Sequence, residues 1–243
     1  MAPLLSVHDY VRGVLASTAV AAQPIRVTLN RARALRLRSE GEQALRADPL
    51  ARGSLLGQLH TVLKGRSPTT FQTSRRPWSV AFAGEGADDV GGPFRECLAE
   101  VCTDALSPAL GLFVASPNNV HNHGAERDAY VPQSGVVSSL SLSRLTFLGR
   151  LMGACLRGGE PLALPLSSFV WRALCGDTRD TTPLGLLSSF DSAAATSLCA
   201  LTGIDASTDA ETFESIYDGA FLTHLSDGSE VPVIPGGAGV QVT

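Results

Sequence analysis

The stretch GEGADDVGGPFRE, residues 84–96, gives the clearest local signal for the fold. Its glycines and acidic residues predict a tight turn, and the residues that follow predict a helix. Pro93 suits the first position of that helix, because its missing N–H would have no partner inside the helix there. We therefore expect Gly92 to cap the helix, with Asp88 and Asp89 near the positive end of its dipole.

A glycine-rich turn that leads into a helix can also bind phosphate. Here Glu85, Asp88 and Asp89 place three carboxylates in the turn, and carboxylates repel phosphate. The Lys-Ser/Thr pair of a nucleotide-binding loop is absent, and no basic residue appears before Arg95. The alternating oxygen ligands and distal glutamate of a calcium loop are absent as well. We interpret the turn as a structural one that caps a helix.

The flanking segments predict a chain with more helix than strand. The sequence WSVAF, residues 78–82, alternates apolar and small residues and predicts a short strand before the turn. Further strands are expected at 112–115, 231–234 and 240–242, the last two paired across the Pro-Gly-rich link between them. Helices are expected at 26–46, 54–63, 93–105, 144–157, 169–174 and 192–201. The predicted fold class is α+β and mostly helical.

The overall composition is that of a folded protein without a strong electrostatic preference. Of the 243 residues, 44% are hydrophobic and 17% charged, and the net charge of −4 gives no reason to expect nucleic acid or an anionic membrane as partner. No apolar run reaches the roughly 18–20 residues that span a bilayer. We interpret the early arginines as a solvated helix face: Arg26, Arg31, Arg33, Arg36 and Arg38.

No residue pattern in the chain identifies an active site. His121 and His123 form an HxH pair, but further ligands are not evident nearby, so a polar surface loop is favoured over a metal site. A GxSxG motif is absent. The five cysteines form no CxxC, which favours a reducing, intracellular location, and we expect the cytoplasm. We expect inert, packed thiols for most of them, with Cys175 the more exposed: Cys97, Cys102, Cys155, Cys175 and Cys199.

An ordered series of motifs carries a resemblance over about residues 25–243. It comprises IRVTLNR (25–31), SLLGQL (54–59), the acidic turn, LGLFVASPN (110–118), YVP (130–132), FLGRLMGACLR (147–157), LALPLSSFVWRALCG (162–176), LSDGSEVPVIPGG (225–237) and VT (242–243). This series resembles the amino-terminal lobe of the HECT-type ubiquitin ligases. Each motif taken alone is mostly structural, and the order of the set carries the resemblance.

The resemblance implies a division into domains and a reaction. It implies an N-terminal extension at 1–24, a large subdomain at 25–179 and a small, truncated subdomain at 180–243 that docks a ubiquitin-conjugating enzyme. In this family ubiquitin passes from that enzyme to a cysteine of a C-terminal lobe, which follows a threonine, and then to a substrate protein. None of the five cysteines here follows a threonine. We therefore expect no catalytic residue in this chain, no cofactor and no metal.

The resemblance also implies where the partner docks. The helix near residues 197–201 and a strand near Phe213 correspond to the surface that faces the conjugating enzyme. Leu198 and Phe213 are the expected apolar contacts, and the alternative is that both are core residues. The expected partners are a ubiquitin-conjugating enzyme, ubiquitin and a substrate protein. The other functional hypothesis is a non-catalytic, degenerate HECT-like interaction module.

Overall fold

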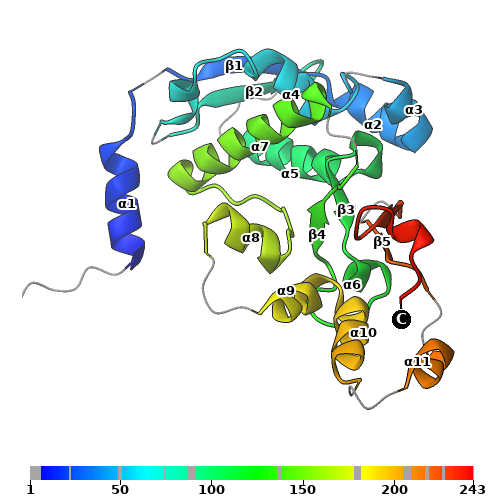
Figure 1. The fold of residues 1–243 in the computed structure, drawn as a ribbon. Helices are drawn as coiled ribbons and strands as arrows, with labels where there is room; N and C mark the ends of the chain where they lie inside the picture. The colour runs from blue at the N-terminus through cyan, green and yellow to red at the C-terminus, as the bar shows by residue number, and fades with distance from the viewer. Residues whose placement is uncertain are drawn as a thin grey trace, which may run out of the picture. The chain divides into compact units, whose positions relative to one another are not determined.

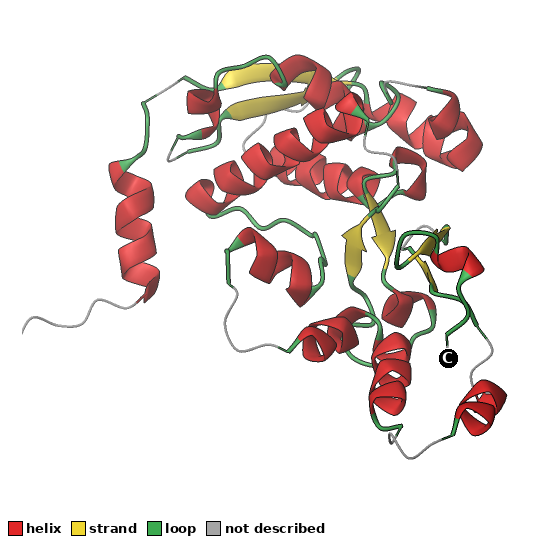
Figure 2. Cartoon of the chain, in the orientation of Figure 1, coloured by secondary structure: helices red, strands yellow, loops and turns green. Residues whose placement is uncertain are grey.

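Over the residues that it describes, the computed structural model is mostly helical with three two-stranded sheets, which confirms the predicted α+β class (Figure 2). Among the described residues no helix is both long and apolar enough to cross a membrane. By its internal packing the chain forms two units, which we describe separately. The structure describes residues 7–21, 23–48, 51–73, 75–86, 91–135, 138–177, 182–204, 209–216, 219–225 and 228–242.

Unit 1 comprises Met1–Leu112 and Ser138–Leu164, and unit 2 comprises Phe113–Val137 and Pro165–Thr243 (Figure 1). The elements of unit 1 are α1 (Val7–Ser17), β1 (Ile25–Leu29), α2 (Arg31–Ser39), α3 (Glu42–Ala47), α4 (Leu55–Leu63), η1 (Pro68–Phe71), β2 (Trp78–Phe82), α5 (Gly92–Ala105), η2 (Pro108–Leu110) and α7 (Ser139–Gly158). Those of unit 2 are β3 (Phe113–Ala115), α6 (Pro117–Val120), β4 (Tyr130–Pro132), α8 (Ser168–Leu174), α9 (Pro183–Phe190), α10 (Ser192–Thr202), α11 (Ala210–Ile216), β5 (Leu222–His224), β6 (Glu230–Pro232) and η3 (Gly237–Gly239).

The prediction of one helix over 26–46 is wrong at its start. Residues 25–29 form β1, which pairs in parallel with β2 so that Val27 lies opposite Val80. Val27 and Leu29 are buried, whereas Arg26 and Thr28 are exposed. This alternation is typical of a strand with one buried face. Helix α2 then begins after Asn30, whose side chain accepts a hydrogen bond from the Arg33 N–H at 2.8 Å.

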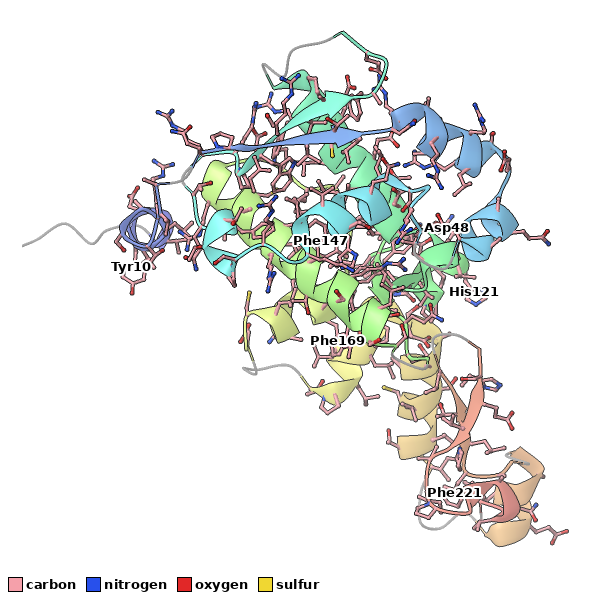
Figure 3. The ribbon with its side chains drawn as sticks, turned by 90° about the horizontal axis from the view of Figure 1, so that it is seen from above. Tyr10, Asp48, His121, Phe147, Phe169 and Phe221 are labelled. Atoms are coloured by element: carbon pink, nitrogen blue, oxygen red, sulfur yellow. The ribbon has the colours of Figure 1, made fainter. Side chains whose placement is uncertain are left out.

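The core of unit 1 lies among α4, α5, α7 and the β1–β2 pair. Trp78 of β2 and Phe94 of α5 have their ring centroids 5.2 Å apart, and the buried Phe147 of α7 packs edge-on to Phe71 at 6.3 Å (Figure 3). Helix α4 buries Leu55, Leu56, Leu59 and Leu63. Apolar side chains spaced three to four residues apart thus meet in one interior, as the helical periodicity predicted.

The helix after the acidic turn begins one residue earlier than predicted. Gly91, not Gly92, is the N-cap, and its φ of +125° is a conformation that side chains rarely adopt. A Cβ at Gly91 would lie 2.8 Å from an Arg76 guanidinium nitrogen, which a shift of the flexible arginine could relieve, so the positive φ is the reason for glycine here. Asp88 and Asp89, which we placed near the helix dipole, lie outside the described residues.

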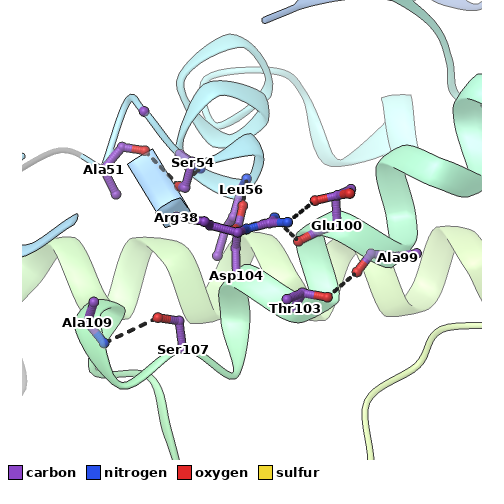
Figure 4. Close-up of polar contacts among 12 residues, drawn as sticks. Arg38, Ala51, Ser54, Leu56, Ala99, Glu100, Thr103, Asp104, Ser107 and Ala109 are labelled. Carbon is purple, nitrogen blue, oxygen red and sulfur yellow. Dashed lines mark hydrogen bonds and ion pairs between the residues drawn. The ribbon is translucent and has the colours of Figure 1, made fainter. Parts of the chain in front are cut away.

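Two of the early arginines are ion-paired and do not belong to a merely solvated face. Arg31 pairs with Glu85 and Glu96, and Arg38 pairs with Glu100 and Asp104. Asp104 is buried and also accepts a hydrogen bond from the Leu56 N–H at 3.0 Å, near the start of α4 (Figure 4). Its carboxylate therefore links α2, α4 and α5, and burial raises its pKa from the usual value despite these bonds.

The strand pairing near the C-terminus differs from the prediction. Residues 231–234 do not pair with 240–242; β6 pairs antiparallel with β5, with Thr223 opposite Val231, and Gln241 bridges to Ala220 on the same segment. The link folds into η3 instead of a hairpin turn, and its buried Gly237 lies against the Phe221 carbonyl. The segment 220–224 is thus the shared partner of both predicted strands.

Candidate docking surface

The buried thiols of unit 1 are unsuited to nucleophilic chemistry. Cys97, Cys102 and Cys155 are buried. Burial raises the pKa of Cys102 to about 11 and that of Cys155 to about 12, so both remain protonated at neutral pH. These three match the prediction of packed thiols.

Two cysteines lie at the surface of unit 2. Cys175 is exposed at the C-terminal end of α8, as the glycine that follows it suggested. Cys199 is exposed on α10, so our expectation that it would pack in the core is wrong. The reason is that α10 turns only part of its apolar surface inward, and Ala195 is its buried residue.

The histidine pair lies in a turn. His121 caps the short helix α6, and both His121 and His123 are exposed. Among the described residues no group of three His, Cys, Asp or Glu side chains is placed to hold a metal ion. The pair forms part of a polar surface turn instead.

A buried asparagine builds the corner that positions α10. Asn118 of α6 accepts hydrogen bonds at its Oδ1 from the Ser192 N–H at 2.8 Å and the Ser192 hydroxyl at 2.9 Å. Its Nδ2 donates to the carbonyl oxygens of Ala125, Ser188 and Ser189 at 2.9–3.3 Å. The end of α9 and the start of α10 are therefore fixed to α6 by one side chain.

Helix α10 presents Leu198 to solvent. Asp191 begins the helix by accepting a hydrogen bond from the Ala194 N–H at 2.9 Å. The helix packs against α9 and α6, and Leu198 remains 44% exposed. Because that much of its surface is free, Leu198 is available for contact with a partner.

Phe213 lies on a helix, so the prediction of a strand near it is wrong. Asp209 precedes α11 and accepts a hydrogen bond from the Thr212 N–H at 2.7 Å, a helix-starting contact that lowers the pKa of Asp209. The Phe213 side chain is half-buried. Leu198 and Phe213 thus belong to two successive helices of unit 2, with the undescribed residues 205–208 between them.

Sequence reasoning missed other exposed apolar residues of unit 2. On α8, Phe169 and Trp171 are exposed, and the ring of Phe169 also packs on that of Phe190 with centroids 5.4 Å apart. Near β6, Val233, Ile234 and Val240 are exposed. The apolar run around the Pro-Gly link was visible in the sequence, but we assigned it to strand pairing.

Comparison with known protein families matches residues 99–243 to the family described as HECT-domain (ubiquitin-transferase). Over 150 residues the chain is 35% identical to the Mus musculus protein "E3 ubiquitin-protein ligase HERC2", covering 62% of this chain and 3% of that protein. The Homo sapiens protein of the same name gives the same values. The Homo sapiens "Probable E3 ubiquitin-protein ligase HECTD4" is 30% identical over 103 residues, or 42% of this chain and 2% of that protein. The chain therefore spans only a few per cent of the length of these relatives.

Proposed function

The chain belongs to the HECT-domain (ubiquitin-transferase) family, and on that basis we propose that it docks a ubiquitin-conjugating enzyme charged with ubiquitin. Docking would use the small subdomain at 180–243, with Leu198 and Phe213 as apolar contacts. The ubiquitin would then pass to a cysteine other than the five of this chain. The observation that carries the proposal is the exposed Leu198 on α10, within the family match.

In this proposal the chain positions the partners of the thioester transfer and does not supply a reactive group of its own. A thiolate attacks the thioester carbonyl of ubiquitin, a new carbon–sulfur bond forms, and the conjugating enzyme's cysteine leaves as a thiolate. A lobe that holds the conjugating enzyme close to the acceptor turns a bimolecular step into one between neighbours. This role fits a chain whose Cys97, Cys102 and Cys155 are buried, since burial raises the pKa of the Cys102 and Cys155 thiols.

The docking residues are tested by titrating the chain with ubiquitin-conjugating enzymes that carry no ubiquitin. The chemical shifts of the chain's backbone amides are followed by NMR. We expect Leu198→Ala to weaken binding about tenfold, since truncating an apolar anchor at an interface commonly costs more than about 1 kcal/mol. Phe213→Ala should weaken it as much or more. Leu142→Ala is the matched control, because Leu142 is an exposed leucine on α7 of unit 1.

Thermal melts of each variant separate lost contact from lost fold. Unchanged binding by folded Leu198→Ala and Phe213→Ala would remove both residues from the proposal. Absence of binding to every conjugating enzyme tested, by the folded parent chain, would overturn the docking role. That result would favour the other hypothesis, a non-catalytic interaction module.

A further inference from the structure

A small pocket of unit 1 gathers positive charge, and we infer that it binds a phosphate monoester group. The pocket has a volume of about 220 Å³. It lies between the C-terminal end of α4 and one face of α7. Its lining residues are Lys64, Ser143, Thr146, Phe147 and Arg150.

The spacing of the α7 residues brings their side chains together. Ser143, Thr146, Phe147 and Arg150 follow the i, i+3, i+4, i+7 pattern that shares one helix face. Arg150 Nη1 lies 3.5 Å from the Lys64 carbonyl oxygen, which holds the arginine beside the end of α4. The pocket is thus bounded by two elements that are themselves packed in the core of unit 1.

Among the described residues, the charges of the pocket have no acidic partner. The described residues that line the pocket include a lysine and an arginine and no aspartate or glutamate. Within the part of the chain that the structure describes, Lys64 and Arg150 form no ion pair, whereas Arg31, Arg38 and Arg76 each bond to carboxylates. Two neighbouring cations without an anion repel each other, and an anion between them would remove that repulsion.

A second guanidinium strengthens the positive field behind the pocket. Arg144 adjoins Ser143 on α7 and is only 5% exposed. Its Nε and Nη2 have no hydrogen-bond partner among the described residues, and Asp48 is the acidic group that opposes its charge. A buried, incompletely paired guanidinium is costly unless further negative charge approaches it.

The positive charges near the pocket also lower the pKa of a neighbouring histidine. His60 of α4 is buried, and its Nε2 lies 2.9 Å from the Ser143 hydroxyl oxygen. Burial lowers the pKa of His60, and the charges of Lys64 and Arg144 lower it further. With the ring proton on Nε2, Ser143 accepts that hydrogen and can donate its own hydroxyl hydrogen to a ligand in the pocket.

The donor set favours a phosphate monoester over a carboxylate. A phosphate monoester carries about −1.5 to −2 charges at neutral pH and offers three acceptor oxygens. The pocket supplies an arginine fork, a lysine ammonium and the hydroxyls of Ser143 and Thr146. A carboxylate brings one charge and two oxygens, which would leave part of this set unused. The volume is several times that needed by one water molecule, so the group fits with some of its hydration.

The test is an NMR titration of the 243-residue chain with inorganic phosphate, with chloride added to hold the ionic strength constant. We expect saturable shifts of α7 amides and a rise in the pKa of His60, because the bound dianion offsets the neighbouring cations. Lys64→Gln and Arg150→Gln should each weaken binding about tenfold, as expected for a lost charge-assisted hydrogen bond. Arg36→Gln on the exposed face of α2 removes the same charge and should change nothing.

Two further experiments identify the source of the phosphate group and distinguish lost binding from lost folding. Tighter binding of the peptide acetyl-Ala-phosphoserine-Ala-amide than of inorganic phosphate would indicate a phosphorylated protein as source, and the reverse order a small phosphate. Thr146→Ala keeps both charges and should weaken binding about threefold even if the charge variants fail to fold. Shifts that do not saturate, that acetate reproduces, or that Arg36→Gln reduces as much as Arg150→Gln would overturn the site.

Discussion

The two units differ in how many apolar side chains they bury. All of the large side chains that are completely buried among the described residues belong to unit 1, including Trp78, Phe94 and Phe147. Of the 32 buried apolar residues described, 26 lie in unit 1 and 6 in unit 2. Unit 2 has the smaller apolar core, and hydrogen bonds of the Asn118 side chain fix the corner between its helices α9 and α10, whereas large apolar side chains are exposed in both units. The comparison indicates that unit 1 holds most of the apolar core among the described residues.

The largest expected effect is a loss of stability from a substitution in the core of unit 1. Phe94→Ala should destabilise the chain by about 4 kcal/mol, because it removes a completely buried ring and leaves a cavity. Phe169→Ala in unit 2 should cost about 1 kcal/mol, because that ring is already partly exposed. Urea denaturation followed by circular dichroism measures both values. Equal losses would contradict the contrast between the units.

The next effect tests the polar link of unit 2. Asn118→Ala removes the hydrogen bonds to Ser188, Ser189 and Ser192 at a part-buried corner, which should cost about 2 kcal/mol. Hydrogen exchange should quicken in α9 and α10 while α4 and α5 keep their protection. A control at Asn119, whose side chain donates only to the Ala129 carbonyl, should show a smaller effect. Uniform loss of protection in both units would show that they unfold together.

A smaller effect concerns the ion pairs of unit 1. Glu160 binds Arg95 Nε at 2.8 Å and Arg76 Nη2 at 2.9 Å, and the hydrogen bond from Arg95 is the main cause that lowers the pKa of Glu160 below its ordinary 4.5. A carboxylate with a lowered folded pKa stabilises the fold above pH 4.5, and this contribution is lost as pH falls through the folded value.

Glu160→Gln should therefore cost roughly 1 kcal/mol at pH 7 and nothing below the folded pKa, because the exposed Arg95 limits the strength of the pair. Stability curves in urea at pH 7 and at successively lower pH measure the difference. A loss that does not shrink as pH falls would show that Glu160 acts through packing and not through charge.

The last prediction is that a measurable ubiquitin adduct does not form. The chain should form no reducible ubiquitin thioester when mixed with a charged conjugating enzyme, because three of its cysteines are buried and none follows a threonine. Cys175→Ser and Cys199→Ser, which remove the exposed thiols, should leave the gel pattern unchanged. An adduct that disappears with reductant or with either variant would assign catalytic chemistry to unit 2 and contradict the proposal that unit 2 only docks the conjugating enzyme.

Elements with local signals were predicted well from the sequence. The helices α4, α5, α7, α8 and α10 follow apolar residues three to four apart and start at side-chain caps or near proline, so their signals lie within a few turns. Strand β1 was missed because its partner β2 lies about fifty residues further along the chain. Helix formers after Asn30 also suggested that the helix began earlier than it does.

The candidate site was predicted only in part. Leu198 was placed correctly on a helix, and Phe213 was assigned to a strand although Asp209 and Thr212 supplied a helix cap. The exposure of Leu198 could not be read from its neighbours, because Ala195 and Leu198 are both apolar and only one is covered. The pocket between Lys64 and Arg150 had no sequence signal, since its residues come from segments about eighty positions apart.

The sequence by itself determined the fold class, the family and the absence of a threonine–cysteine pair, because periodicity, caps and ordered motifs are local properties of the chain. Only the tertiary structure decided that β1 pairs with β2, that Cys199 and Leu198 face solvent, and that Lys64 and Arg150 line one pocket. The physical reason is that burial and charge depend on contacts between distant segments, and only packing specifies those contacts.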